Sequence, residues 1–347
     1  MNHLPFPTSH GGDIYSRHVT FDFSANLNPL GMPEGVKKAL TEGMDSFSHY
    51  PDVSCAALRE AIAAREGCDA ERIVCGNGAA DMIWRIPPAF RPRRALIPAP
   101  TFSEYERALL TFGCEVVRYF TREEDSFALR EDFSQSVAGC DVVFVCRPNN
   151  PVGNLAARDL LWNLIETCAA SGTLLVLDEC FIEFTGEKPL AAAGLPGDVI
   201  LLRAFTKIYA MAGLRLGYAM CSRHETAQRL RDFGPCWSVS VPAQIAGVAA
   251  LRERGFVEKT VSLIAGERAF LAEGLRGMGL KVFSSRANFL LFRCGLPLDR
   301  MLLREGIAIR CCGDYHGLSE QYFRIAVRTR EENRILLNAI ERCVKNG

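Results

Sequence analysis

The sequence predicts an α/β fold with a mostly parallel sheet, followed by a smaller α+β domain at the C-terminus. From Arg72 onward, short runs of β-branched or apolar residues alternate with longer stretches that have the apolar spacing of helices. After Pro235 this alternation gives way to long helical patterns and then to shorter strands. With 347 residues, 48% of them hydrophobic, the chain is long enough to bury a large core in two domains.

The first predicted elements of the large domain surround a glycine-containing turn. RIVCGNG indicates a strand that breaks at residues 76–78, and a helix starts near Ala79. RRALIPAP and CEVVRYF are the next strands, and the helical stretch SEYERALLTF separates them. Alternating strands and helices of this length are typical of a parallel sheet whose connections are helical.

Three strongly apolar strands follow. CDVVFVCRPNNPVG predicts a buried strand that ends in a turn rich in Pro, Asn and Gly. The next stretch indicates a helix that stops at Gly172, because its apolar residues share one helical stripe: Leu160, Leu161, Leu164, Ile165 and Cys168. TLLVLDECF and DVILLRAF are two further buried strands.

The remaining pattern sets the predicted domain limits. Residues 242–279 are helical; KVFSS, NFLLFRC, IAIRCC and YFRIAVR are strands; TREENRILLNAIERCVKN closes the chain as a helix. We expect residues 1–45 to form an N-terminal arm and part of the small domain. Residues 46–240 would form the large domain, and residues 241–347 the small C-terminal domain with its connecting helix.

Composition excludes several classes of function. Forty basic and forty acidic residues give zero formal charge without a basic block, which argues against a nucleic-acid or membrane-surface partner. No apolar run approaches the ~20 residues of a membrane helix. The fourteen cysteines lack C-x-x-C spacing and the six histidines form no cluster, so we expect no metal site. Without a secretory h-region, the cysteines indicate a reduced, mostly core set in a cytoplasmic protein.

Charged residues at strand ends suggest a functional site. Lysine is rare here, since the 40 basic residues comprise 7 Lys and 33 Arg, yet Lys207 follows a buried strand. A lysine amine can lose its proton, whereas an arginine guanidinium effectively cannot. Asp178 ends the preceding strand, at the edge where open α/β sheets bind ligands. A structural ion pair is the alternative, but the PNNPVG turn at a third strand end favours a site.

Four motifs occur in an order that is specific in combination: RPNNPVG (147–153), the Asp178–Glu179 pair, TKIYAMAGLRLG (206–217) and YFRIAV (322–327). With them, the chain resembles pyridoxal-phosphate enzymes of the aspartate-aminotransferase fold over nearly its whole length. The resemblance implies transferase fold type I, in which the large domain has a mostly parallel seven-stranded sheet and binds pyridoxal 5'-phosphate.

The resemblance also implies roles for residues around the cofactor ring. Lys207, the catalytic residue, would hold the cofactor as a Schiff base and then shuttle protons, which only an amine can do. Asp178 would pair with the pyridinium nitrogen, Asn150 would hydrogen-bond the ring hydroxyl and Phe102 would stack on the ring.

The resemblance implies that a second set of residues binds the cofactor phosphate. Gly78 and Ala79 would offer backbone amides at a helix N-terminus, a natural anion site. Arg215 would add a charge-assisted contact. Tyr50 matches a tyrosine that reaches the phosphate across a dimer interface, so the resemblance implies a homodimer.

The chain departs from the family pattern at two places near this phosphate. Ala204 stands where a serine or threonine is common, and Ala79 and Ala80 follow GNG without a hydroxyl. We therefore expect cofactor binding to depend more on backbone amides, Thr206 and the residues named above, with weaker retention as a possible consequence.

Two groups within this fold resemble the chain most: histidinol-phosphate aminotransferases and the L-threonine-O-3-phosphate decarboxylases of cobalamin biosynthesis. HGGDI (10–14) and DFSANLNPLGMP (22–33) resemble the decarboxylase N-terminus, as CWSVSVPAQ and RANFLLFRC resemble later decarboxylase segments. Phe181 stands where the aminotransferases usually carry tyrosine.

These features favour decarboxylation of a phosphorylated amino acid, L-threonine O-3-phosphate, to (R)-1-amino-2-propanol O-2-phosphate. Arg324 would bind the α-carboxylate. A second anion site would comprise Arg310 with His10, Gly11 and Gly12, and Asn28 nearby, although an ordinary turn is the alternative for the two glycines. The runners-up are a histidinol-phosphate or related aminotransferase, and a serine-phosphate decarboxylase.

Overall fold

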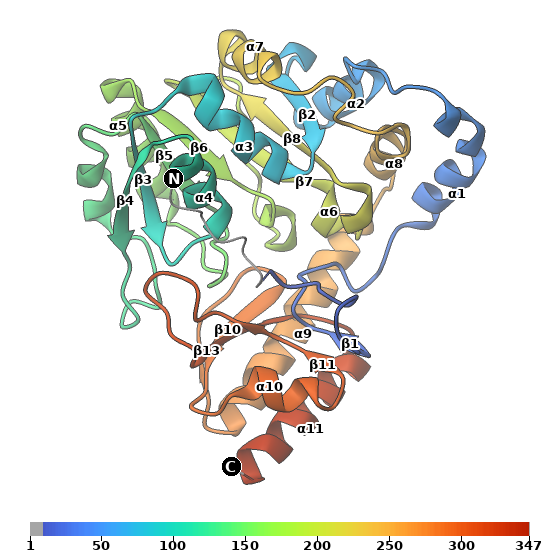
Figure 1. The fold of residues 1–347 in the computed structure, drawn as a ribbon, viewed down its shortest axis with the longest axis vertical. Coiled ribbons are helices and arrows are strands. Elements are labelled where there is room, and N and C mark those ends of the chain that lie inside the picture. Colours follow the sequence, from blue (N-terminus) through green and yellow to red (C-terminus); the bar gives the residue numbers. More distant parts are fainter. Residues whose placement is uncertain (1–9, 347) are drawn as a thin grey trace.

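A computed structural model of the chain describes residues 10–346. Its largest sheet has seven strands, and helices cover both faces (Figure 1). In sheet order the strands are β2 (Ile73–Asn77), β8 (Leu216–Cys221), β7 (Val199–Ala204), β6 (Leu174–Asp178), β5 (Val142–Cys146), β3 (Arg94–Ala99) and β4 (Glu115–Phe120). The predicted α/β class and mostly parallel seven-stranded sheet are confirmed.

One strand of this sheet was not predicted. β8 runs antiparallel to both of its neighbours, β2 and β7. It contains Gly217, where an added Cβ would lie 2.4 Å from the amide nitrogen of Ala79. The glycine therefore lets the strand pass directly beside the start of the next helix, and this close approach matters for the site.

The central strands are apolar because both of their faces are covered. Val143 and Val145 of β5 belong to one buried cluster, whereas Val142 and Phe144 belong to the cluster on the opposite face. Two sets of helices complete these clusters: α3 (Ala79–Phe90), α4 (Ser103–Thr111) and α7 (His224–Asp232) on the second face, and α2 (Ala56–Glu66), α5 (Arg158–Ser171) and α8 (Val241–Leu251) on the first.

The C-terminal part lies against one end of this layer (Figure 1). Its antiparallel sheet has the order β12 (Arg310–Cys311), β13 (Tyr322–Ala326), β10 (Phe289–Arg293) and β9 (Lys281–Val282). Its helices are α9 (Phe256–Gly277), α10 (Leu298–Leu303) and α11 (Arg330–Asn346). The strands and helices predicted after Pro235 are present, except that the stretch IAIRCC is divided into two short strands, β11 (Ile307–Ala308) and β12, which belong to different sheets.

The N-terminal segment connects the two parts. β1 (Phe21–Asp22) pairs in parallel with β11 (Ile307–Ala308), and α1 (Glu34–Glu42) then packs against α8. The short α6 (Phe205–Ile208) follows β7. The predicted domain limits stay a prediction, and residues 1–9 of the predicted arm lie outside the described residues.

Two further observations concern the whole described chain. All fourteen cysteines are free and most are buried, as the sequence analysis expected. Among residues 10–346, no helix combines the length and the apolar character needed to span a membrane.

Candidate active site

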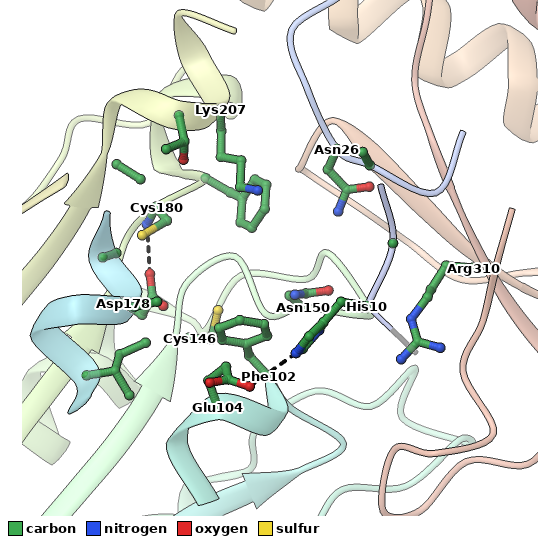
Figure 2. A pocket seen from close by; sticks show the side chains of 18 of the residues that line it. His10, Asn26, Phe102, Glu104, Cys146, Asn150, Asp178, Cys180, Lys207 and Arg310 are labelled. Atoms are coloured by element: carbon green, nitrogen blue, oxygen red, sulfur yellow. Dashed lines mark hydrogen bonds and ion pairs between the residues drawn. The ribbon is translucent and has the colours of Figure 1, made fainter. Parts of the chain in front are cut away.

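A pocket of about 490 Å³ opens at the carboxyl ends of the parallel strands (Figure 2). Asp178 is the last residue of β6, and Lys207 lies in the short helix that directly follows β7. Most of the residues predicted to bind cofactor or substrate line this pocket: His10, Gly11, Ala79, Phe102, Asn150, Asp178, Thr206, Lys207, Arg215, Arg310 and Arg324. Chain segments more than 300 residues apart therefore meet at one place.

The Lys207 amine lies in an environment that favours its neutral form. Burial, and then the positive charge of Arg324, lower its pKa to about 8 from the usual 10.5. The shift raises the fraction of neutral amine near pH 7.5 by about two orders of magnitude, since each pKa unit is a factor of ten. The amine also lies 5.9 Å from the centroid of the Phe181 ring. This lysine is therefore suited to attack a carbonyl carbon.

Asp178 places a buried carboxyl group in the lining of the pocket. Its side chain is buried, with the residue only 5% exposed. The Tyr105 hydroxyl donates to Oδ2 at 2.6 Å, and the Cys180 amide donates to Oδ1 at 2.9 Å. Burial and the Asp178 charge raise the pKa values of the Tyr105 hydroxyl and the Cys180 thiol well above their usual range, so both groups stay protonated. The two donors thus fix the orientation of this buried carboxylate.

The start of α3 lies at another wall of the pocket, which Ala79 and Ala80 line. Gly78 precedes the helix with a φ of 79°, a conformation that favours glycine, and no side chain caps the helix there. A Cβ at Gly78 would lie 2.7 Å from Arg215 Nη2, so the guanidinium lies almost against the backbone. Free helix N–H groups beside an arginine are a common arrangement for binding phosphate.

Two arginines enter the pocket from the C-terminal sheet. Arg310 of β12 is the direct register partner of Arg324 of β13, so their side chains lie on the same face of the sheet. Arg324 donates to Asn150 Oδ1 and, at 2.8 Å, to the Ser24 carbonyl, while its buried Nε has no partner among the described residues. Like charges placed directly opposite each other are unfavourable unless anions lie between or beside them.

Arg310 is held in place by its own loop. Its Nη2 contacts both Asp314 carboxylate oxygens, at 2.8 and 2.6 Å, and its Nη1 donates to the Cys311 carbonyl. The guanidinium carbon also lies 5.4 Å from the centroid of the Tyr315 ring. These contacts fix the position of a cation that lines the pocket (Figure 2).

The structure does not bring every predicted residue into the pocket. Gly12 is not among the lining residues; its amide donates to the Ser24 hydroxyl at 2.8 Å. Tyr50 lies elsewhere, 81% exposed, with its ring 4.8 Å from the Trp237 ring. Gly78 is outside the lining but touches Arg215, as described above.

The expectation for Asn28 needs correction. Its side-chain amide donates to the Ile208 carbonyl at 2.7 Å and to the Thr260 hydroxyl at 2.8 Å, and its backbone amide donates to the Lys207 carbonyl at 3.2 Å. Asn28 is buried and does not line the pocket, because these contacts direct it toward α6. It supports the turn that carries the lysine, and Asn26 lines the pocket in its place.

Sequence reasoning also missed several lining residues: Asn26, Glu104, Arg107, Cys146, Cys180 and Tyr315. Glu104 was overlooked because an acidic residue in the first turn of a helix is explained by the helix dipole alone. Cys146 and Cys180 look like ordinary core cysteines in the sequence. Only the nearby charged residues, Arg147 and Asp178, indicate that these cysteines lie close to a site.

Comparisons with known proteins agree with this geometry. A family model described as Aminotransferase class I and II matches residues 19–340. The chain belongs to this family.

Two relatives of the chain are notable. It is 37% identical to a threonine-phosphate decarboxylase from Salmonella typhimurium, with 96% of each chain covered. It is 32% identical to an adenosylcobalamin biosynthesis bifunctional protein from Leptospira interrogans, where 92% of this chain and 38% of the relative are covered.

Two solved structures are similar throughout. A histidinol-phosphate aminotransferase from Clostridium acetobutylicum has a TM-score of 0.87 at 29% identity, covering 94% of this chain and 100% of the other. An L-threonine-O-3-phosphate decarboxylase from Porphyromonas gingivalis has a TM-score of 0.83 at 27% identity, covering 93% and 99%. The fold is common to both activities, so the fold alone does not distinguish the two reactions.

Proposed function

We propose that this protein is a pyridoxal-phosphate enzyme that decarboxylates L-threonine O-3-phosphate to (R)-1-amino-2-propanol O-2-phosphate, in cobalamin biosynthesis. The observation that carries the proposal is the register pairing of Arg310 with Arg324, which presents two cations on one sheet face. A substrate with both a carboxylate and a phosphate satisfies them together. The names of the Salmonella, Porphyromonas and Leptospira relatives support the same reaction.

The residues of the pocket fit pyridoxal phosphate. The amine of Lys207 and the carboxylate of Asp178 line the same cavity. The amine suits the aldehyde of pyridoxal phosphate, and the carboxylate suits its pyridine nitrogen. The start of α3, Arg215 and Thr206 line the cavity too and suit the phosphate, and the closeness of Arg215 to Gly78 leaves no space for a side chain there. The buried Asn150 would contact the ring hydroxyl, and Phe102 would cover one ring face. When bound, this cofactor accepts the electron pair released as a bond to the substrate α-carbon breaks.

The protein residues then decide which bond breaks. Arg324 would hold the substrate carboxylate, while Arg310 and His10 would hold its phosphate, so that the substrate is fixed at both ends. Fixing both ends would set the rotation about the α-carbon, and with it which of the α-carbon's bonds the bound cofactor would weaken. Lys207, with its lowered pKa, can deliver a proton to the α-carbon after carbon dioxide has left.

A histidinol-phosphate aminotransferase is the second candidate, because the Clostridium structure has the same fold. Two observations favour the decarboxylase. His10 and Gly11, from the segment that resembles the decarboxylase N-terminus, line the pocket. Phe181 also lines it and cannot donate to the ring oxygen, unlike the tyrosine usual in the aminotransferases. A serine-phosphate substrate differs by one methyl group, worth only ~1–3 kcal/mol of discrimination.

One pair of assays tests the proposal. Purified protein is incubated with pyridoxal phosphate and L-threonine O-3-phosphate, and carbon dioxide and the amine product are measured; O-phospho-L-serine is run in parallel. A second reaction contains histidinol phosphate and 2-oxoglutarate, and glutamate is followed. We expect carbon dioxide and aminopropanol phosphate from the first reaction, and glutamate without carbon dioxide would refute the proposal.

We also infer a cytoplasmic homodimer. The exposed Tyr50 and Trp237 lie together on the surface, and Met44, Phe47 and Val53 are exposed apolar residues of the nearby sequence. Covering this patch with a second copy would let Tyr50 reach the partner's cofactor phosphate, as the family resemblance implies. Free cysteines are typical of a reducing compartment. Light scattering should give twice the chain mass of 38.3 kDa.

A further inference from the structure

Glu104 is an unexpected residue in a pocket that must accept anions. Lys207, Arg215, Arg310 and Arg324 line the same cavity, and each suits a phosphate, a carboxylate or a carbonyl. A second carboxylate besides Asp178 would repel such ligands if it only faced the cavity. A carboxylate at this place is understandable if it accepts hydrogen bonds from neighbouring side chains and so holds them in position.

The contacts of Glu104 support such a role. Its side chain is only 9% exposed and lies in the first turn of α4. Oε2 accepts from Trp84 Nε1 at 2.9 Å, while Oε1 contacts His10 Nε2 at 3.1 Å and Arg107 Nη1 at 3.3 Å. The hydrogen bond with His10, the hydrogen bond with Trp84 and the positive charge of Arg107 outweigh burial and lower the pKa of Glu104 to about 2. These contacts therefore favour the charged form of the carboxylate.

The backbone of the N-terminal segment is also fixed close to the pocket. A Cβ at Gly11 would lie 2.2 Å from the Ser24 carbonyl oxygen, so the segment passes directly against the bend that follows β1. The amide of Gly12 donates to the Ser24 hydroxyl. These contacts hold the main chain, but the His10 ring is held by Glu104 and by its approach to the Phe102 ring, 6.2 Å between centroids.

The orientation of the ring follows from these contacts. An imidazole that contacts a carboxylate through Nε2 presents Nδ1 on its opposite side. Figure 2 shows His10 extending toward Glu104 from the N-terminal segment, with the Arg310 guanidinium approaching from the other side of the ring. Both residues line the pocket, and in this view both lie on the side away from Lys207 and Asp178.

We propose that Glu104 is a positioning residue that holds His10 at the mouth of the pocket so that the imidazole binds the substrate phosphate together with Arg310. This inference rests on the proposed function, since it takes a phosphorylated amino acid as the ligand. Glu104 itself touches neither cofactor nor substrate. It acts through His10, and Trp84 and Arg107 fix the carboxylate in turn.

A double-mutant cycle tests the proposal. The variants are Glu104→Gln, which keeps the shape but removes the charge, His10→Ala, and the double variant. Glu267→Gln is the matched control, because it neutralises an equally buried carboxylate that contacts Arg330 and Asn333 between α9 and α11. Steady-state kinetics with L-threonine O-3-phosphate are combined with calorimetric binding of inorganic phosphate and with inhibition by L-threonine.

We expect Glu104→Gln to raise KM about tenfold and to leave kcat within about threefold, because the lost contact is made equally before and during the reaction. In the His10→Ala background, Glu104→Gln should change KM very little. Inhibition by L-threonine, which has no phosphate, should stay as in the parent protein. Three results would overturn the proposal: an unchanged KM for Glu104→Gln, fully multiplicative effects of the two substitutions on KM, or an equal weakening of the inhibition by L-threonine.

Binding of inorganic phosphate separates this proposal from the proposed function. If the parent protein releases no carbon dioxide but loses phosphate affinity on Glu104→Gln, the reaction assignment fails and the role of Glu104 stands. If carbon dioxide is released and phosphate affinity and KM are both unaffected, the reaction stands and the role of Glu104 fails. Far-ultraviolet circular dichroism and the Tm of each variant confirm that the variants are folded.

Discussion

A buried ion triad beneath the pocket provides a sharp test of how the site is held together. Glu179 follows Asp178 directly, and its side chain is 0% exposed. Arg147 Nη1 lies 2.5 Å from Glu179 Oε1, and Arg203 Nη2 lies 2.6 Å from Oε2. Arg147 begins the loop that carries Asn150, and Arg203 lies in the strand that leads to the lysine. One carboxylate therefore joins the ends of three neighbouring strands.

The perturbation is Glu179→Gln, which keeps the size of the side chain but removes its charge. Two guanidiniums, 8% and 3% exposed, would then face each other without the anion between them. Removing one partner of a buried ion pair costs about 3–5 kcal/mol, because the remaining charge is left uncompensated. With a urea m-value of roughly 3 kcal/mol/M, the unfolding midpoint should fall by about 1 M or more.

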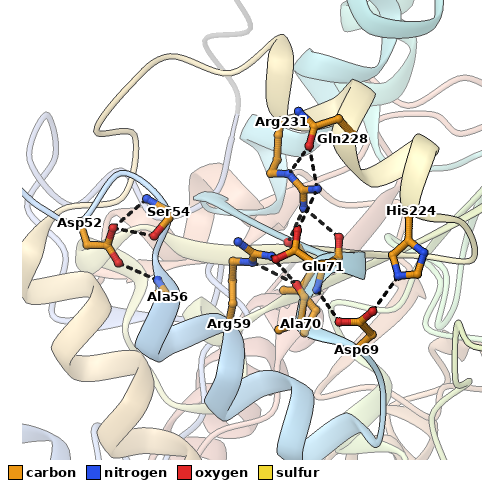
Figure 3. Close-up of polar contacts among 11 residues, drawn as sticks. Asp52, Ser54, Ala56, Arg59, Asp69, Ala70, Glu71, His224, Gln228 and Arg231 are labelled. Atoms are coloured by element: carbon orange, nitrogen blue, oxygen red, sulfur yellow. Dashed lines mark hydrogen bonds and ion pairs between the residues drawn. The ribbon is translucent and has the colours of Figure 1, made fainter.

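Urea unfolding of the cofactor-free protein, followed by circular dichroism, measures this change without the stabilisation that a bound cofactor adds. Glu71→Gln is the control, because Glu71 is exposed and pairs with two arginines, Arg59 at 2.7 Å and Arg231 at 3.5 Å (Figure 3). An exposed pair of this kind contributes less than about 1 kcal/mol. If the two variants lose similar stability, the reasoning about the buried triad is wrong.

Three further predictions concern the cofactor. Because burial and Arg324 lower the pKa of Lys207 to about 8, the rate of cofactor attachment, followed by absorbance, should rise with pH through that value and level off; a rise continuing to pH 10.5 would contradict it. Gly78→Ala, at a φ of 79° with its Cβ 2.7 Å from Arg215 Nη2, should raise the Kd for pyridoxal phosphate at least about tenfold, and an unchanged Kd would mean that the guanidinium moves aside freely. Ala204→Ser should lower the same Kd about three- to tenfold, and no change would mean that the phosphate is already satisfied.

The sequence predicts the large sheet well where local pattern determines structure. β5, β6 and β7 are continuous apolar runs that end in turn residues or charges, so their position and burial follow from composition alone. β8 was not predicted, because its first residues, Leu216 and Gly217, belong to the motif TKIYAMAGLRLG, which indicates ligand binding and not a strand. The reason for that glycine is a contact with α3, more than 100 residues away, which no local pattern contains.

The candidate site divides in the same way. Lys207 and Asp178 could be predicted because a titratable amine and an acid at strand ends are unusual in themselves. The position of Asn28, by contrast, depends on partners 180 and 232 residues away, Ile208 and Thr260. Glu104 likewise acquires its significance only from His10, 94 residues earlier. Local sequence indicates which residue types are available, whereas long-range packing decides which of them meet.

This division bears on how one fold supports both decarboxylation and transamination. The groups that suit the cofactor come from the ends of the large sheet, and relatives with either activity share that fold. The groups proposed to hold the two ends of the substrate come from outside that sheet: His10 from the N-terminal segment, and Arg310 and Arg324 from β12 and β13. Because the rotation about the α-carbon depends on these outer contacts, the reaction can change while the lysine, the aspartate and the sheet stay the same.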